Sequence, residues 1–212
     1  MAEAADGFRR LRPSGLPDET LGAFRYAVTR YHANGTRHCA YNFLSTNMTP
    51  SKIVLGLWPI AGITTVGVKP SEAIATIEAA IQHGIDTFDT AYSYGFDGES
   101  DRLLGDLIRK DRERYAVMGK VGQRWNDQHQ RIVDGTPEQL VRDAETSLRR
   151  IGTDYFDILF LHSPDPSVPL ETSAEAMQRM KDRGWCENLG ICNATPAQIT
   201  AFSRVADTAA IQ

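Results

Sequence analysis

The sequence predicts an α/β protein built around a parallel β-sheet, and three observations support that prediction. From about residue 52 onward, short apolar runs alternate with amphipathic stretches in a strand–helix repeat. The run YFDILFLH at 155–162 is apolar on both faces, as a strand buried inside a parallel sheet should be. Helix-start residues such as Ser71 and the pair Thr136-Pro137 open the amphipathic stretches. Right-handed helical crossovers between parallel strands account for all three observations.

The first half of the repeat gives two strands, each followed by a helix. Residues 52–58, KIVLGLW, form the first expected strand, and a helix over 71–83 gathers isoleucines on one face before Gly84 closes it. Residues 86–91, DTFDTA, favour extended chain, and leucines give the segment 99–110 an apolar helix face. Each helix is therefore expected to pack one face on the sheet.

The second half continues the repeat. Its expected strands are 115–121, 155–162, 188–193 and the start of a sixth strand at 209–212. Its expected helices are 136–150, 171–183 and a third that Pro196 opens. A complete eight-fold barrel needs about 250 residues. About six strands in 212 residues therefore fit either a doubly wound open sheet or an incomplete (β/α) barrel.

The composition excludes several classes of function. Hydrophobic residues make up 42% of the chain and charged residues 24%, which is typical of a soluble globular protein. The net charge of −4 gives no reason to expect nucleic acid or an anionic membrane as a partner. No membrane-length apolar run and no secretory h-region are present. Cys39, Cys186 and Cys192 lack metal-ligand spacing, so we expect neither disulfides nor a metal site and predict a cytoplasmic location.

Polar residues follow the expected strands, where parallel α/β proteins carry their chemistry. Asp89 ends the second strand and Tyr94 lies in the loop after it, while Lys120 ends the third strand and His162 the fourth. The later strand ends add Cys192, Asn193 and Gln212. If the sheet curls into a barrel, the first four side chains face one another across its mouth.

These four groups together suit protonation of a developing alkoxide, which carbonyl reduction by hydride requires. The phenol of Tyr94 is a poor acid at its ordinary pKa near 10, and an ammonium at Lys120 would lower that pKa. A carboxylate at Asp89 would keep the lysine charged, and His162 would orient a carbonyl oxygen. Each residue alone also has an ordinary structural interpretation, as a turn, surface or strand-end residue. Their joint placement favours the catalytic interpretation.

Several segments resemble the aldo-keto reductases, most closely the bacterial and plant members that are like sugar or pyridoxal dehydrogenases. They are GLWPIAG at 56–62, FDTAYSYGFDGESDRLLG at 88–105, GK at 119–120, TPEQLVRDAETSLRRIGTDYFDILFLHSPDP at 136–166 and GICN at 190–193. The resemblance implies a parallel (β/α)8 TIM barrel. Residues 51–212 would form about six of its eight units, after an N-terminal segment, 1–50, of unclear structure.

The resemblance also implies a reaction and a cofactor. The cofactor would be NADP(H), or alternatively NAD(H), bound without the Rossmann glycine loop that is absent here. Hydride would pass between nicotinamide and a small carbonyl or alcohol, such as an aldehyde, a sugar or pyridoxal. By analogy Tyr94 is the proton donor, Lys120 tunes it, Asp89 holds Lys120 at the cofactor site, and His162 and Trp58 contact the substrate. The nicotinamide carboxamide would be held at Cys192, Asn193 and Gln212.

The sequence departs from the family pattern in three places. Cys192 replaces the usual serine, and a thiol forms weaker hydrogen bonds. The chain ends at the sixth strand, so it is interpreted as truncated before the two units whose loops grip the cofactor phosphates. Residues 1–50 do not show the family's amino-terminal hairpin, and the stretch 30–47 looks unrelated to it. Because an open barrel exposes two sheet edges, we expect this chain to be poorly stable or to aggregate.

Other functions stay open at this point. A catalytically silent or regulatory barrel, as in members resembling channel β-subunits, or an inactive truncated product, would fit the absence of the cofactor-gripping units. The four intact polar residues favour chemistry instead. An unrelated open-sheet protein would leave the ordered motifs unexplained. No motif identifies the substrate, the choice of NADP over NAD, or the oligomeric state.

Overall fold

The computed structural model describes residues 53–63, 65 and 67–212, and the backbone of residues 24–27 and 40–44. Its parallel strands are β3 (Leu55–Gly56), β4 (Thr87–Asp89), β5 (Ala116–Val121), β8 (Phe156–Leu161), β9 (Cys186–Ile191) and β10 (Thr208–Ile211). Each of these strands pairs in parallel with the next one of this group. The spatial order of these parallel strands follows their order along the chain throughout, whereas the order reverses in a doubly wound sheet. The predicted barrel-type α/β fold is confirmed, and the barrel is not closed.

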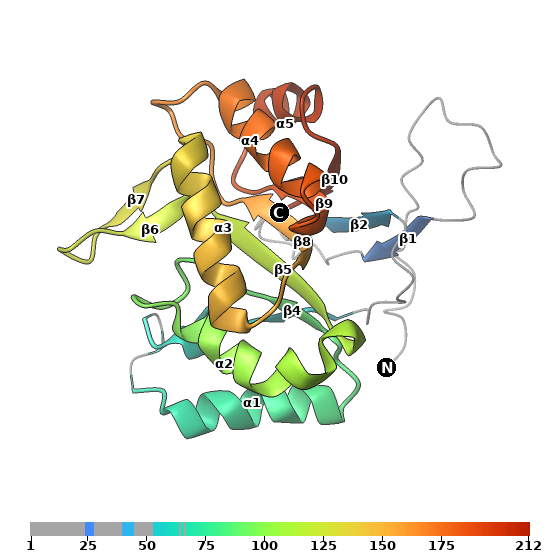
Figure 1. The fold of residues 1–212 in the computed structure, drawn as a ribbon. Helices are drawn as coiled ribbons and strands as arrows, with labels where there is room; N and C mark the ends of the chain where they lie inside the picture. The colour runs from blue at the N-terminus through green and yellow to red at the C-terminus, as the bar shows by residue number, and fades with distance from the viewer. Residues whose placement is uncertain (1–23, 28–39, 45–52, 64, 66) are drawn as a thin grey trace, which may run out of the picture.

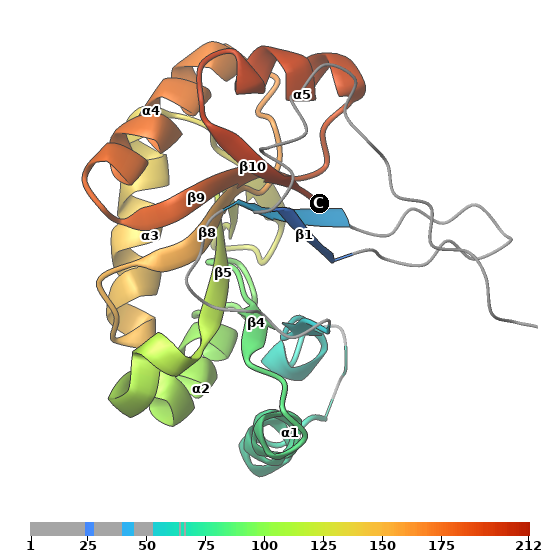
Figure 2. The same ribbon diagram turned by 90° about the vertical axis from the view of Figure 1, so that its right-hand side faces the viewer.

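Helices cover the convex side of the curved sheet (Figures 1 and 2). They are α1 (Pro70–Gln82), α2 (Glu99–Ile108), α3 (Pro137–Ile151), α4 (Leu170–Asp182) and α5 (Pro196–Ser203), with short 3₁₀ turns at η2 (Pro59–Ala61) and η3 (Arg109–Arg114). Proline occupies the first turn of α1, α3 and α5, where its missing N–H costs no helix hydrogen bond. Gly152, at φ 78°, ends α3 in the left-handed conformation that glycine tolerates.

The sheet has an apolar layer on each face. Val117 and Val121 of β5 face outward and join the buried cluster beneath the helices. Met118 faces inward and packs with Phe160 of β8 in a second, smaller cluster. Side chains alternate along a strand, so a residue two places further on shares the same face. This alternation directs Lys120, two residues after Met118, to the concave side of the sheet.

Two short strands from the first 50 residues join the sheet. β1 (Phe24–Ala27) pairs antiparallel with β2 (Ala40–Leu44), and β2 pairs antiparallel with β10. The sheet therefore runs β1-β2-β10-β9-β8-β5-β4-β3 (Figure 2). The expectation that both edges of the parallel sheet are exposed is wrong at β10, because β2 takes up the hydrogen bonds of that edge. The rest of residues 1–50, including Cys39, lies outside the described residues.

A separate antiparallel hairpin follows β5 and was not expected from the sequence. Its strands are β6 (Gln123–Trp125) and β7 (Arg131–Val133), and it projects from the barrel end beside α3 (Figure 1). The side-chain oxygen of Asn126 accepts hydrogen bonds from the backbone N–H groups of Gln128 and Gln130, at 3.0 and 2.9 Å, which fixes the turn. The hairpin also reaches the loop after β4, because the indole N–H of Trp125 donates to the carbonyl of Ser93 at 2.9 Å.

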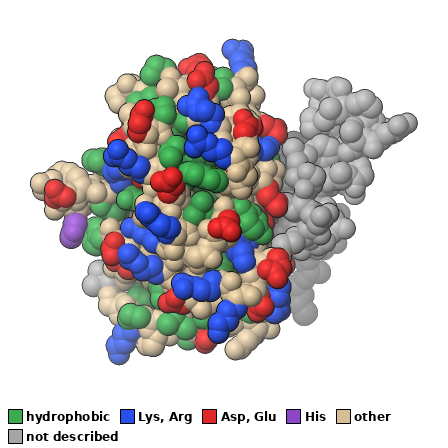
Figure 3. Space-filling view, viewed as in Figure 1, with side chains coloured by type: hydrophobic (Ala, Val, Ile, Leu, Met, Phe, Trp, Pro, Cys, Tyr) green, Lys and Arg blue, Asp and Glu red, His purple; other side chains and the backbone are tan. Residues whose placement is uncertain are grey.

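The face of the molecule seen in Figure 3 mixes acidic and basic side chains over the helices. Charges of both signs lie next to one another there, as expected for a chain with a small net charge of −4. No helix in the described part of the chain is long and apolar enough to cross a membrane.

Candidate active site

The structure brings Asp89, Tyr94, Lys120 and His162 together at the carboxyl ends of β4, β5 and β8. The ammonium of Lys120 donates hydrogen bonds to the carboxylate of Asp89 and, at 3.1 Å, to the phenol oxygen of Tyr94. The phenol of Tyr94 lies 3.4 Å from the same carboxylate oxygen. The ring of His162 meets that of Tyr94 edge-on, with centroids 5.9 Å apart. One carboxylate, one ammonium, one phenol and one imidazole therefore share a single site.

Backbone contacts hold the loop that carries Tyr94. The N–H of Tyr92 donates to the carbonyl of Lys120 at 3.0 Å, so the loop continues the pairing of β4 with β5 beyond the strand end. The N–H of Tyr94 donates to the carbonyl of Ala91 at 2.9 Å and closes a tight turn. Gly95 follows at φ 96°, a conformation that other residues rarely adopt. This turn points the phenol back over the strand end and toward Lys120.

Burial governs the acidity of the phenol. Removal from water disfavours the phenolate and raises the pKa of Tyr94 to about 12, although Lys120 alone would lower it. The expectation that the neighbouring ammonium lowers this pKa is wrong for the net shift, because the cost of burying the phenolate is larger. Burial also opposes the charge on Lys120, but attraction to Asp89 and to Tyr94 outweighs it and raises the pKa of Lys120. At neutral pH the site holds a protonated phenol beside a charged lysine.

His162 is buried and neutral. The residue is 7% exposed, and burial, reinforced by the charges of Lys120 and Arg131, lowers the pKa of His162 well below its ordinary value. Its Nδ1 atom has no hydrogen-bond partner among the described residues. A buried polar atom without a partner is uncommon in proteins. A carbonyl oxygen placed beside Tyr94 would lie close to this imidazole, which can form a further hydrogen bond.

The three residues expected at the nicotinamide carboxamide also lie together. The thiol of Cys192 donates to the side-chain oxygen of Gln212 at 3.2 Å, and the amide nitrogen of Gln212 donates to Asp89 at 2.9 Å. The side-chain amide of Asn193 donates to the carbonyl of His162 at 2.8 Å. These amides thus connect the ends of β9 and β10 to the four-residue cluster. Among the described residues, no three His, Cys, Asp or Glu side chains are grouped so as to hold a metal ion.

Comparison with known proteins assigns this chain to a family. The model of the Aldo/keto reductase family matches residues 52–212. The chain belongs to the aldo/keto reductase family. The resemblance expected from the motifs is thereby confirmed.

Relatives of this aldo/keto reductase chain are found in bacteria. The aldo-keto reductase YhdN of Bacillus subtilis (strain 168) is 35% identical over 169 residues, which are 79% of this chain and 50% of that protein. The glycerol dehydrogenase AKR11B4 of Gluconobacter oxydans superposes with a TM-score of 0.69 at 31% identity, over 75% of this chain and 50% of that one. An aldo/keto reductase of Klebsiella pneumoniae solved with NADP gives 0.59 at 30% identity, over 73% and 50%. The chain spans about half the length of each of these relatives.

An aromatic wall borders the four-residue cluster of this aldo/keto reductase. The ring of Trp58, which follows β3 and Leu57, packs on that of Tyr94 with centroids 5.0 Å apart. The guanidinium of Arg131 lies over Trp58 at 4.7 Å and over Trp125 at 4.9 Å. Sequence reasoning missed Trp125 and Arg131, because both belong to the unexpected hairpin. The only sequence signal was the turn-forming Asn126 between two short segments.

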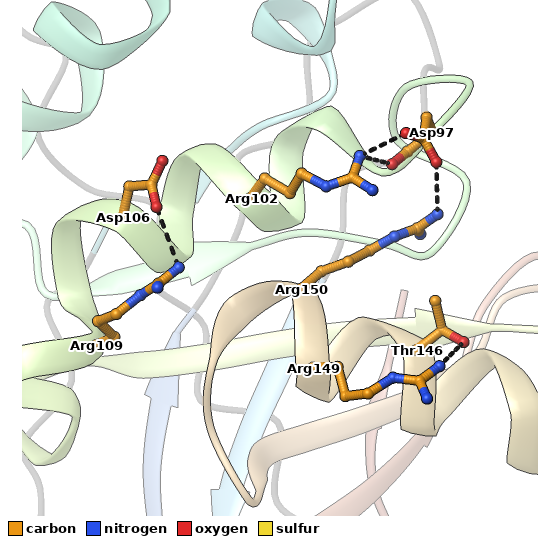
Figure 4. Close-up of a pocket in the computed structure, with 7 residues that line it drawn as sticks. All are labelled: Asp97, Arg102, Asp106, Arg109, Thr146, Arg149 and Arg150. Atoms are coloured by element: carbon orange, nitrogen blue, oxygen red, sulfur yellow. Dashed lines mark hydrogen bonds and ion pairs between the residues drawn. The ribbon is translucent and has the colours of Figure 1, made fainter.

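A hollow of about 550 Å³ lies on the outside of the barrel between α2 and α3 (Figure 4). Its lining residues are Asp97, Arg102, Asp106, Arg109, Thr146, Arg149 and Arg150. Asp97 pairs with both Arg102 and Arg150, and Asp106 pairs with Arg109. Its charges are largely paired within the wall, and none of the four clustered residues lines it, so we assign the chemistry to the strand ends instead.

Proposed function

We propose that this chain carries the proton-transfer site of an NADP(H)-dependent oxidoreductase that interconverts a small carbonyl compound and its alcohol. The observation that supports the proposal most strongly is the contact between the phenol of Tyr94 and the ammonium of Lys120, at 3.1 Å and beside a buried carboxylate. An aldehyde, a sugar or pyridoxal fits the small-molecule class, and NAD(H) is the alternative cofactor.

The residues of the chain divide the work of reduction. A nicotinamide cofactor, when bound, would supply the hydride for the carbonyl carbon. Tyr94 is fully protonated at neutral pH, since its pKa is about 12, and it gives its proton to the carbonyl oxygen. Lys120 stabilises the phenolate left behind, and Asp89 keeps Lys120 charged and in place. Neutral His162 donates a hydrogen bond to the same oxygen and orients it.

The polar groups next to this cluster suit a primary carboxamide, which needs both donors and acceptors. Asn193 and Gln212 each carry an amide with both kinds of atom, at the ends of neighbouring strands. Gln212 is directly hydrogen-bonded to Asp89, and Asn193, an exposed residue that donates through its amide nitrogen, retains acceptor capacity at its side-chain oxygen. These two residues would hold the nicotinamide amide, with Cys192 as a weaker third group.

Cofactor binding followed by turnover tests the proposal. NADPH fluorescence is titrated with the chain, and NADPH oxidation is then followed with a generic aromatic aldehyde as substrate. Binding with turnover supports the proposal. Binding without turnover of any aldehyde in a panel would favour a catalytically silent barrel, and absence of NADPH and NADH binding would remove the redox function from this chain.

A further inference from the structure

Arg131 lies at the edge of the candidate active site in an unusual setting. The central carbon of its guanidinium lies over the indole of Trp58 and over that of Trp125, at 4.7 and 4.9 Å from the ring centroids. A planar guanidinium that packs on an aromatic ring carries its N–H donors in its own plane, where they can still form hydrogen bonds. The two indoles therefore restrict the side chain and leave its N–H donors available.

The positive charge of Arg131 is not neutralised by the part of the protein that the structure describes. Ion pairs there engage other arginines, including the buried Arg112 with Asp157 and Arg124 with Asp143. None of the ion pairs within the described ranges involves Arg131. Arg131 is exposed to solvent. A fixed, unpaired guanidinium is the group that proteins most often use to bind carboxylate or phosphate.

The location ties this charge to the reacting groups. Trp58, which stacks on Arg131, also packs on Tyr94, with ring centroids 5.0 Å apart. Only one indole ring thus separates the guanidinium from the proposed proton donor. The charge of Arg131 also reaches His162, where it contributes to keeping the imidazole neutral. A substrate with its carbonyl at Tyr94 would extend past Trp58 toward Arg131.

We propose that Arg131 binds a terminal oxyanion of the carbonyl substrate, so that the preferred substrates are small aldehydes or ketones that carry a carboxylate or a phosphate. This inference rests on the proposed reductase function and specifies its substrate class. Arg131 takes no part in proton transfer. It selects the substrate and positions its carbonyl between Tyr94 and His162.

Matched substrate pairs test the selectivity. One pair is 4-oxobutanoate and butanal, and the other is glyceraldehyde 3-phosphate and glyceraldehyde. Arg131→Met removes one charge-assisted contact to the anionic substrate. We expect this variant to lower the ratio of kcat/KM for the anionic substrate to kcat/KM for its neutral partner by about 10- to 100-fold. Arg131→Lys should recover part of the preference. The pair that responds more strongly distinguishes carboxylate from phosphate.

The matched control is Arg183→Met. Arg183 also lies over a tryptophan, Trp185, at 5.9 Å, but just before β9, at the opposite end of the strands from the cluster. This variant should keep the wild-type ratio of anionic to neutral substrates. If Arg131→Met lowers both members of a pair equally, its role is structural and the inference is wrong. If Arg131→Met weakens NADPH binding without changing the ratio, Arg131 binds the cofactor and the inference is again wrong.

A binding measurement separates this inference from the reductase function. Trp58 and Trp125 flank Arg131, so their fluorescence should report an anion bound there once Trp185 is replaced by Phe. Succinate or inorganic phosphate should change the emission of Trp185→Phe saturably, and Arg131→Met in that background should lose the change. Retention of this response without Arg131 would overturn the inference. If the unmutated chain shows the anion response but turns over no aldehyde, the result would count only against the reductase function.

Discussion

Breaking the buried pair of Lys120 with Asp89 should destabilise the fold strongly. The side chains are 2% and 5% exposed, so neither charge can be compensated by water. In Lys120→Met the carboxylate keeps other donors, among them the amide of Gln212 at 2.9 Å and the phenol of Tyr94 at 3.4 Å. Removal of one partner of a buried pair costs about 3–5 kcal/mol. Because these two donors remain, we expect a loss near the lower end, about 3 kcal/mol.

A double-mutant cycle isolates the interaction. Urea unfolding is measured for Lys120→Met, Asp89→Asn and the double variant, in which no unpaired charge remains. We expect a coupling free energy of about 2–3 kcal/mol, so that the double variant is far more stable than additivity predicts. The control cycle uses Arg109→Met and Asp106→Asn, whose exposed ion pair spans 3.0 Å and should couple by less than about 0.5 kcal/mol. Additive effects at Lys120 and Asp89 would refute the reasoning.

Three further predictions concern pH and the cofactor. Lys120→Met should shift the optimum for alcohol oxidation to higher pH, since Tyr94 must then accept a proton without its cationic neighbour; a pH–rate profile with a lower optimum would contradict the pairing. Burial raises the pKa of Asp101 to about 6, although the hydrogen bonds that its carboxylate accepts from Thr90 and Ser147 oppose the shift. Between about pH 4 and 6 the native state therefore keeps a proton on Asp101 that the unfolded chain has lost. The stability that this group contributes falls as the pH rises through that range. Asp101→Asn should accordingly cost about 2 kcal/mol more at pH 4 than at pH 7 by urea unfolding, and an equal cost at both would be inconsistent with this pKa. Cys192→Ser should tighten NADPH binding by roughly fivefold through a stronger donor, measured by fluorescence titration; weaker binding would exclude this residue from the cofactor site.

Local patterns predicted the repeat because each helix and strand carries its own signal. Thr136-Pro137 and Gly152 bound α3, and the doubly apolar run at 156–161 is β8. The hairpin of β6 and β7 was missed because each strand has three residues, too few to show an alternation. The pairing of β2 with β10 was missed because it joins segments far apart in the chain, which no local pattern encodes.

Strand periodicity also placed part of the candidate site. Lys120 lies on the same strand face as Met118, so its direction follows from the alternation once the inner face is known. The net shift in the pKa of Tyr94 did not follow, because burial depends on how Trp58 and the neighbouring loops close over the phenol. The position of Arg131 depends on the same tertiary packing.

The central claim is that Tyr94 is the proton donor of a hydride-transfer site. Rapid-mixing measurement of NADPH oxidation by the chain and by Tyr94→Phe, with NADPH affinity determined for both, tests it most directly. We expect the phenylalanine variant to bind NADPH with similar affinity and to oxidise it at least about a hundredfold more slowly with an aldehyde present. An unchanged rate of NADPH oxidation in the variant would contradict the proposed role of Tyr94.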